Sequence, residues 1–165
     1  MQDYETDVLA LAQALNTRRW RMASAESCTG GLIATACTSV AGSSDWFERG
    51  FVTYSNEAKT QMLGVDADLI AAHGAVSEAV ALAMVRGALQ HAPVQLAVAV
   101  TGIAGPGGAV PGKPVGTVWL AWGTAAAQRC HLLQLQGSRE QIRAATTHAA
   151  LKALIGAALS PSMSA

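Results

Sequence analysis

The chain has 165 residues, of which 51% are apolar and only 5% aromatic, and its eleven acidic and eleven basic residues cancel. This length predicts a single domain with a sizeable core, built mainly of Ala, Val and Leu. Nucleic-acid binding needs clustered cations, so the zero net charge and the lack of any Lys/Arg block argue against it. Because no apolar run approaches the roughly 20 residues that span a bilayer, we expect no membrane partner either.

Three cysteines, an odd number without a C-x-x-C pair, occur at Cys28, Cys37 and Cys130. The N-terminus is acidic and lacks a signal-peptide pattern, so the cysteines indicate reduced thiols in a cytoplasmic protein. The four histidines have no metal-ligand spacing, and no glycine pattern completes a phosphate- or dinucleotide-binding loop. We therefore expect neither a metal ion nor a cofactor.

The apolar pattern predicts helices that alternate with strands. Helices are expected where apolar residues recur every three or four positions, and strands where they form short continuous runs. The expected helices cover 6–18, 32–40, 56–63, 66–72, 77–90 and 138–159, and the expected strands cover 20–25, 51–54, 96–100, 115–123 and 128–136. Such alternation indicates a three-layer α/β/α sandwich around a mixed β-sheet. One domain is expected over 1–160, with a loose C-terminal tail over 161–165.

The segment 45–49 admits two conformations with different consequences. A straight strand from Ser44 to Tyr54 would separate its ends by about 30 Å, leaving Ser44 far from Lys59. A serine N-cap, an acidic residue in the first turn and Gly50 after the last residue favour a helical turn instead. We therefore expect a turn over 45–49, followed by the strand over 51–54.

Reactive side chains gather on loops that follow expected strands. In α/β sheets ligands bind at the carboxyl ends of strands, where the loops 26–31, 54–59 and 101–108 are expected. Each residue alone has a structural explanation. Ser27 and Ser44 can each cap a helix, Cys28 can pack in the core, and Lys59 can lie in solvent. Several such residues on converging loops favour one functional site.

Six segments together resemble the CinA C-terminal-domain family, and the resemblance covers almost the whole chain. They are AESCTGG at 25–31, AGSS at 41–44, FVTYSNEAK at 51–59, HGAVS at 73–77, TGIAGP at 101–106 and KPVGTV at 113–118. The stand-alone form of this family implies an enzyme that converts nicotinamide mononucleotide to nicotinic acid mononucleotide and ammonia. One departure is the apolar segment 109–112, where family members are often polar or acidic.

The resemblance also implies roles for individual residues. Ser44 would be the nucleophile and Lys59 its base, with Tyr54 and Ser27 assisting. The nucleotide would be held by residues of two loops and one arginine, namely Thr29, Gly30, Gly31, Thr101, Gly102, Ile103, Ala104, Gly105 and Arg143. Arg143 would contact the phosphate.

Two other functions and one assembly remain open at this stage. The chain could be a non-catalytic nucleotide-binding or regulatory module linked to competence or DNA damage, or a cysteine amidase that uses Cys28. The apolar potential of Trp46, Phe47 and Trp122 indicates a homo-oligomer, with a dimer as the expected form.

Overall fold

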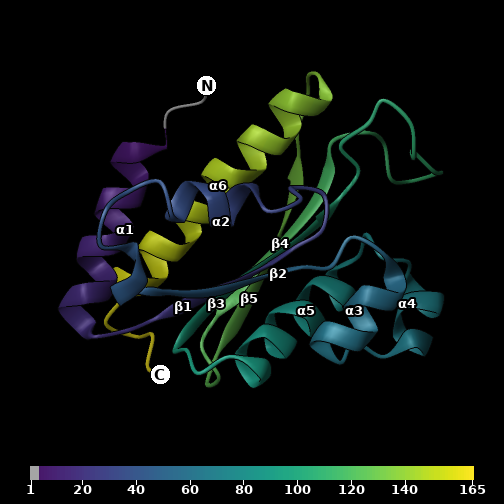
Figure 1. Cartoon of the computed structure of the whole chain (residues 1–165). Coiled ribbons are helices and arrows are strands. Elements are labelled where there is room, and N and C mark those ends of the chain that lie inside the picture. Colours follow the sequence, from purple (N-terminus) through teal and green to yellow (C-terminus); the bar gives the residue numbers. More distant parts are fainter. Residues whose placement is uncertain (1–3) are drawn as a thin grey trace.

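A five-stranded mixed sheet lies between two layers of helices in the computed structural model, which describes residues 4–165 (Figure 1). Its strands, in the order β2-β1-β3-β4-β5, are β1 (Met22–Glu26), β2 (Phe47–Val52), β3 (Leu96–Gly102), β4 (Thr117–Gly123) and β5 (Gln128–Gln134). The central strand β1 runs parallel to both β2 and β3, whereas β4 and β5 join by antiparallel pairing. The predicted three-layer α/β/α sandwich around a mixed sheet is confirmed.

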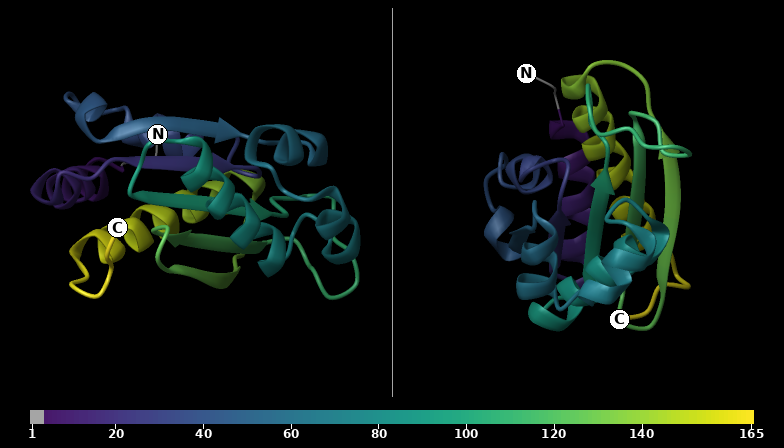
Figure 2. Two further views of the ribbon diagram at one scale, coloured as in Figure 1. Left: turned by 90° about the horizontal axis from the view of Figure 1, so that it is seen from below. Right: turned by 90° about the vertical axis from the view of Figure 1, so that its right-hand side faces the viewer.

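The six helices of residues 4–165 divide between the two faces of the sheet (Figure 2). One face is covered by α1 (Glu5–Arg18), α2 (Leu32–Cys37) and α6 (Arg139–Leu159), which contact one another. The other face carries α5 (Glu78–His91), against which α3 (Asn56–Leu63) and α4 (Ala67–His73) pack. The helices that follow β1 and β2 therefore lie on opposite faces.

Alternating residues of the central strands form two cores of different character. Larger side chains face α1 and α6, and they include Met22, Leu96, Val98, Val100 and Leu120. Alanines face α5, namely Ala23, Ala25, Ala97, Ala99 and Ala121. Successive side chains of a strand point to opposite faces of the sheet, so larger residues and alanines alternate along each strand. The small alanine side chains let α5 pack close to its face of the sheet. The core is rich in Ala, Val and Leu, as its composition predicts.

Serine side chains fix where three of the helices begin. Ser77 Oγ accepts a hydrogen bond from the Val80 N–H at 3.3 Å, which confirms the predicted cap of α5. Ser55 caps α3 in the same way. Ser138 forms a full capping box with Gln141 at the start of α6. These caps satisfy N–H groups that have no partner within the first turn of a helix.

The segment before and within β2 differs from the sequence prediction. A single 3-10 turn, η1 (Ser43–Asp45), precedes a strand that already begins at Phe47, so the turn predicted over 45–49 is wrong. Gly50 is a strand residue rather than a helix terminus. A Cβ atom at Gly50 would lie 3.0 Å from Ser24 Oγ and 3.2 Å from Ala34 Cβ, so close packing explains this glycine.

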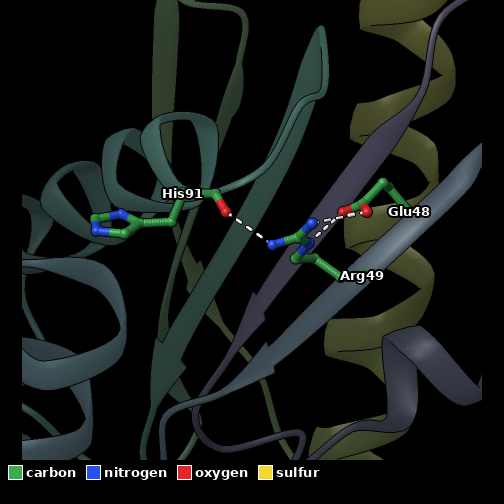
Figure 3. A network of polar contacts seen from close by, with 3 residues as sticks. All are labelled: Glu48, Arg49 and His91. Atoms are coloured by element: carbon green, nitrogen blue, oxygen red, sulfur yellow. Dashed lines mark hydrogen bonds and ion pairs between the residues drawn. The ribbon is translucent and has the colours of Figure 1, made fainter.

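A polar network ties the outer strand β2 to the end of α5 (Figure 3). Arg49 Nη1 donates to the His91 carbonyl oxygen at 3.0 Å, and Nη2 donates to Glu48 Oε1 at 2.8 Å. A cation at the C-terminal end of a helix satisfies a carbonyl that lacks an intrahelical partner. Arg49 is exposed, so this contact belongs to the scaffold at the edge of the sheet.

The aromatic residues expected at the surface lie largely in the core. Trp46 is only 1% exposed, and Phe47 and Trp122 pack against the same cluster of buried residues. The exposed apolar surface predicted from these three residues is therefore wrong. A dimer stays a prediction, without this argument for it.

The C-terminal segment packs on the domain rather than extending away from it. Met163 is buried, and its carbonyl oxygen accepts a hydrogen bond from Arg18 Nη2 at 2.6 Å. Arg18 lies at the end of α1, so α1 holds this segment in place. Within residues 4–165, every helix is too short or too polar to cross a bilayer.

Candidate active site

The carboxyl ends of β1, β2 and β3 meet at one edge of the sheet. Glu26, the last residue of β1, pairs with Val52 of β2 on one side and Val100 of β3 on the other. From this edge the chain leaves β1 toward α2 on one face and leaves β2 toward α3 on the other. Such a divergence opens the crevice where α/β proteins bind their ligands. The three loops therefore converge as the sequence predicts.

A cavity of about 230 Å³ occupies this crevice. Its lining brings together six residues of the predicted site: Ser27, Tyr54, Lys59, Thr101, Gly102 and Ala104. It also includes Cys28, the nucleophile of the alternative cysteine amidase, and four residues that were given no role in the predicted site, namely Asn56, Ala75, Val76 and Arg139. Ile103 and Gly105 belong to the same loop as Ala104, and the Gly105 carbonyl oxygen accepts a hydrogen bond from Arg139.

Lys59 is the most unusual member of this lining. It is only 1% exposed, although a lysine on a short helix normally reaches solvent. Its Nζ lies 3.1 Å from Ser27 Oγ, 2.9 Å from the Thr53 carbonyl oxygen and 3.5 Å from the Ser55 carbonyl oxygen. Burial lowers the pKa of Lys59, because an ammonium group loses its hydration inside the protein.

Ser27 occupies the first position after β1 and points to Lys59 rather than to the following helix. Its N–H donates to the Val100 carbonyl oxygen at 3.1 Å, which fixes the main chain to the sheet. The turn that follows contains Gly30 and Gly31, both with positive φ. Gly31 is the N-cap of α2, so the helix-capping explanation for Ser27 does not hold.

Ser44 is not brought to this cavity, and its predicted pairing with Lys59 is corrected. Ser44 lies in η1, before β2, whereas Lys59 follows the carboxyl end of the same strand. A six-residue strand spans about 20 Å, too far for any contact between the two side chains. The prediction failed because the chain enters β2 directly after η1, without the turn that would have reversed its direction.

Tyr54 and Arg139 lie together at the cavity. Tyr54 is 59% exposed, and its hydroxyl oxygen accepts a hydrogen bond from Arg139 Nη2 at 2.9 Å. Arg139 Nη1 donates to the Gly105 carbonyl oxygen at 2.8 Å. One guanidinium group thus joins the loops after β2 and β3 at the first turn of α6. Sequence reasoning missed Arg139 because only the docking of α6 places it here, although its position next to the predicted Ser138 start was a usable signal.

Arg143 contacts the turn 29–31 rather than the cavity. Arg143 Nη2 donates to the Thr29 carbonyl oxygen at 2.9 Å, and the Thr29 hydroxyl donates to Glu26. The cavity lining formed by residues 4–165 does not include Thr29, Gly30, Gly31 or Arg143. Arg143 instead lines a larger cavity of about 940 Å³ between α1, α2 and α6, to which Arg139 also contributes.

Cys28 lines the smaller cavity, but its environment does not favour a thiolate. Burial raises the pKa of the Cys28 thiol to about 11, because the interior disfavours the charged form. A nucleophilic cysteine needs a lowered pKa, so this alternative loses its physical basis. Within residues 4–165, no group of three His, Cys, Asp or Glu side chains is arranged to hold a metal ion.

Comparison with known proteins agrees with this fold. The sequence model of the CinA C-terminal domain family matches residues 5–158 of this chain. The chain belongs to the CinA C-terminal domain family. Nicotinamide-nucleotide amidohydrolase PncC of Escherichia coli K12 is 50% identical over 145 residues, which are 87% of this chain and 88% of that protein. The enzyme of the same name from Pseudomonas putida is 49% identical over 155 residues, which are 94% of this chain and 97% of that protein.

CinA C-terminal domains also occur within longer proteins and have been crystallised. A CinA-like protein of Syntrophobacter fumaroxidans is 52% identical over 86% of this chain, which spans only 33% of that protein. Competence/damage inducible protein CihA from Agrobacterium tumefaciens has a crystal structure with a TM-score of 0.87 at 45% identity, covering 94% of this chain and 98% of that one. A CinA superfamily protein from Klebsiella pneumoniae gives a TM-score of 0.91 at 38% identity over 95% and 98% of the two chains.

Proposed function

We propose that this chain is an amidohydrolase that converts nicotinamide mononucleotide to nicotinic acid mononucleotide and ammonia. Two relatives called nicotinamide-nucleotide amidohydrolase, about half identical over most of their length, support the substrate and the reaction. The observation that carries the proposal for this chain is the buried Lys59 amine, 3.1 Å from the Ser27 hydroxyl in a cavity at the sheet edge. We assign Ser27 as the nucleophile and Lys59 as its base.

The surroundings of Lys59 suit a neutral amine. An uncharged amine has two N–H groups and one lone pair, and the carbonyl oxygens of Thr53 and Ser55 accept from the two N–H groups. The lone pair then faces Ser27, whose hydroxyl can donate its proton to Nζ. Burial lowers the pKa of Lys59, so a larger fraction of the amine is neutral than for a lysine in water. This combination of a hydroxyl and an adjacent base defines an activated nucleophile.

The reaction proceeds in two stages with balanced bonds and protons. Ser27 Oγ attacks the carboxamide carbon as its proton passes to Lys59, which gives a tetrahedral oxygen anion that N–H donors at the cavity would stabilise. Lys59 then gives this proton to the amide nitrogen, the C–N bond breaks, and ammonia leaves an ester on Ser27. Water, activated by the same amine, attacks this ester and releases the carboxylic acid and the Ser27 hydroxyl.

The remaining lining residues orient the nucleotide. Arg139 supplies a cation at the cavity and lies in the first turn of α6, where the helix dipole favours anions. We place the phosphate near Arg139, with the loop 101–105 against the nucleoside. Tyr54, held by Arg139, lies at the same cavity and assists by orienting the substrate. Arg143 has a lesser role, since its guanidinium donates to the Thr29 carbonyl.

The test is direct incubation of the purified protein with nicotinamide mononucleotide. Stoichiometric release of ammonia and nicotinic acid mononucleotide is expected, with the loss of both products in the Ser27→Ala variant. Binding of the nucleotide without ammonia release would instead identify a non-catalytic nucleotide-binding or regulatory module. Inactivation by a thiol reagent, with Ser27→Ala still active, would point to Cys28.

A further inference from the structure

Glu26, the residue before Ser27, has a carboxylate that five groups of the surrounding chain approach as donors. We infer that Glu26 is a positioning residue whose anionic side chain holds the turn 27–31, and thereby Ser27, in the reactive geometry. The inference rests on the proposed function of Ser27 and adds to it a residue that the substrate does not touch.

The Glu26 side chain is completely buried, and both of its oxygens are shared among several donors. Oε2 accepts hydrogen bonds from the Thr29 hydroxyl at 2.6 Å, the Gly31 N–H at 3.0 Å and the Ile33 N–H at 3.0 Å. Oε1 accepts from the Ala34 N–H at 2.9 Å and lies 3.2 Å from Ser24 Oγ. Three of the five donors are backbone N–H groups from the last residue of the turn and the first residues of α2.

This set of donors fits a carboxylate anion. A buried unpaired charge would be very costly, but hydrogen bonds from several N–H and O–H groups stabilise it. In a protonated carboxyl group, the O–H hydrogen would point at a group that is itself a hydrogen-bond donor, which is unfavourable. The carboxylate also performs the function of a helix cap, since the N-cap residue of α2 is Gly31, which has no side chain.

The turn is fixed at both ends by the same residue. The Glu26 main chain is paired between β2 and β3, and the Thr53 N–H donates to its carbonyl oxygen at 2.9 Å. The side chain reaches forward past Ser27 to Thr29 and Gly31. Ser27 and Cys28 are therefore enclosed in a short loop that closes on one carboxylate. Glu26 is not among the residues of 4–165 that line the cavity, so its effect on the reaction passes through the turn.

The discriminating variant is Glu26→Gln. The glutamine oxygen can occupy the Oε2 position and keep the bonds from Thr29, Gly31 and Ile33. Its amide nitrogen then replaces Oε1, where Ser24 Oγ can turn to accept but the Ala34 N–H loses its acceptor. The protein is expected to fold, with weaker hydrogen bonds because the charge is lost. Small misplacements of reacting groups cost up to about a hundred-fold in rate, so we expect kcat to fall about ten-fold. The KM for nicotinamide mononucleotide is expected to stay within about two-fold, because Glu26 does not contact the substrate.

Two controls separate positioning from loss of stability. Ser24→Ala removes one contact of the same carboxylate on the side away from the turn, and its kcat is expected to stay within about two-fold of wild type. Leu154→Ala empties a fully buried site in α6 and lowers the melting temperature, but at an assay temperature where it is folded its kcat is expected to match wild type. Glu26→Leu, if it folds, should lose more activity than Glu26→Gln.

The assay compares ammonia release by the folded proteins, with circular dichroism recorded at the assay temperature. A lower kcat at unchanged KM in Glu26→Gln, with both controls active, supports the inference. Wild-type kcat in Glu26→Gln, or an equal loss in folded Leu154→Ala, overturns the positioning role while the amidase function stands. A wild-type protein that releases no ammonia overturns the proposed function and this inference together.

Discussion

Hydroxyl side chains lie near both ends of β2, but only at one end do they share a cavity with a buried lysine. At the amino end, Ser44 is exposed in a single 3-10 turn. At the carboxyl end, Tyr54 and Lys59 enter a cavity with Ser27, and Lys59 is buried. The difference comes from the topology of the sheet. Strand β1 runs parallel to both β2 and β3, so the carboxyl ends of these three strands lie at one edge of the sheet. A cluster of reactive residues along the sequence therefore becomes a site only where neighbouring strands end together.

Replacing Lys59 should have the largest effect on the active end of β2. Lys59→Met removes the amine, and ammonia release is expected to fall by about 10² to 10⁴-fold, as for the loss of a general base. Lys59→Arg should be equally inactive, because a guanidinium group stays protonated and cannot accept the Ser27 proton. Steady-state kinetics with nicotinamide mononucleotide measure both losses.

The matched control for this substitution is Lys152→Met on α6. The Lys152 side chain is 70% exposed and lies 3.9 Å from Asp7, far from the cavity lining. Its activity is expected to stay within about two-fold of wild type, since isolated surface ion pairs contribute little. High activity in Lys59→Met would remove the distinction between the two ends of β2.

The pH dependence of the rate sharpens the same comparison. Lys59 must be neutral to accept a proton, and burial lowers its pKa from the usual 10.5. The rate should therefore rise with pH up to the lowered pKa and decrease about ten-fold per pH unit on the acid side of it. Measurement of kcat/KM across this range checks the prediction. A rate that stays constant through the acid side would contradict a titrating base.

The lowered pKa of Lys59 also makes the free energy of unfolding depend on pH. Between the lowered pKa and 10.5, the unfolded lysine binds a proton that the folded lysine lacks. The free energy of unfolding should therefore rise with pH through this window and fall as the pH is lowered. In Lys59→Met this contribution should disappear, which denaturant titrations at several pH values would detect.

The two arginines of the first turns of α6 give the smallest predicted difference. Arg139→Met should raise the KM for nicotinamide mononucleotide about ten-fold, because the variant loses a charge-assisted contact at the cavity. Arg143→Met should raise it less, since Arg143 is bound to the Thr29 carbonyl and lines the other cavity. A larger increase in Arg143→Met would place the phosphate in the larger cavity instead.

Local and periodic features of the fold were predictable from the sequence. The continuous apolar run of β3, the Ser77 cap and the serine, threonine and glycine residues after successive strands all act over a few residues. Together they were enough to predict the layers and the convergence of three loops, because parallel strands end at a common edge.

Features that depend on tertiary contacts were not predictable in this way. Gly50 has the sequence character of a helix end, yet it is a strand residue that packs against Ser24 and Ala34. Arg139 reaches the cavity only through the docking of α6, and Glu26 caps a helix five residues further along the chain. The choice between Ser27 and Ser44 depended on the same information, since only the structure defines which serine Lys59 meets.

The activities of Ser27→Ala and Ser44→Ala, measured side by side with nicotinamide mononucleotide, test the central claim most directly. Both changes remove one hydroxyl, from opposite edges of the sheet. Ser27→Ala is expected to lose at least about 10³-fold in kcat, as for other nucleophile removals, while Ser44→Ala stays within about two-fold of wild type. Full activity in Ser27→Ala, or its loss in folded Ser44→Ala, would contradict the assignment of Ser27 and Lys59.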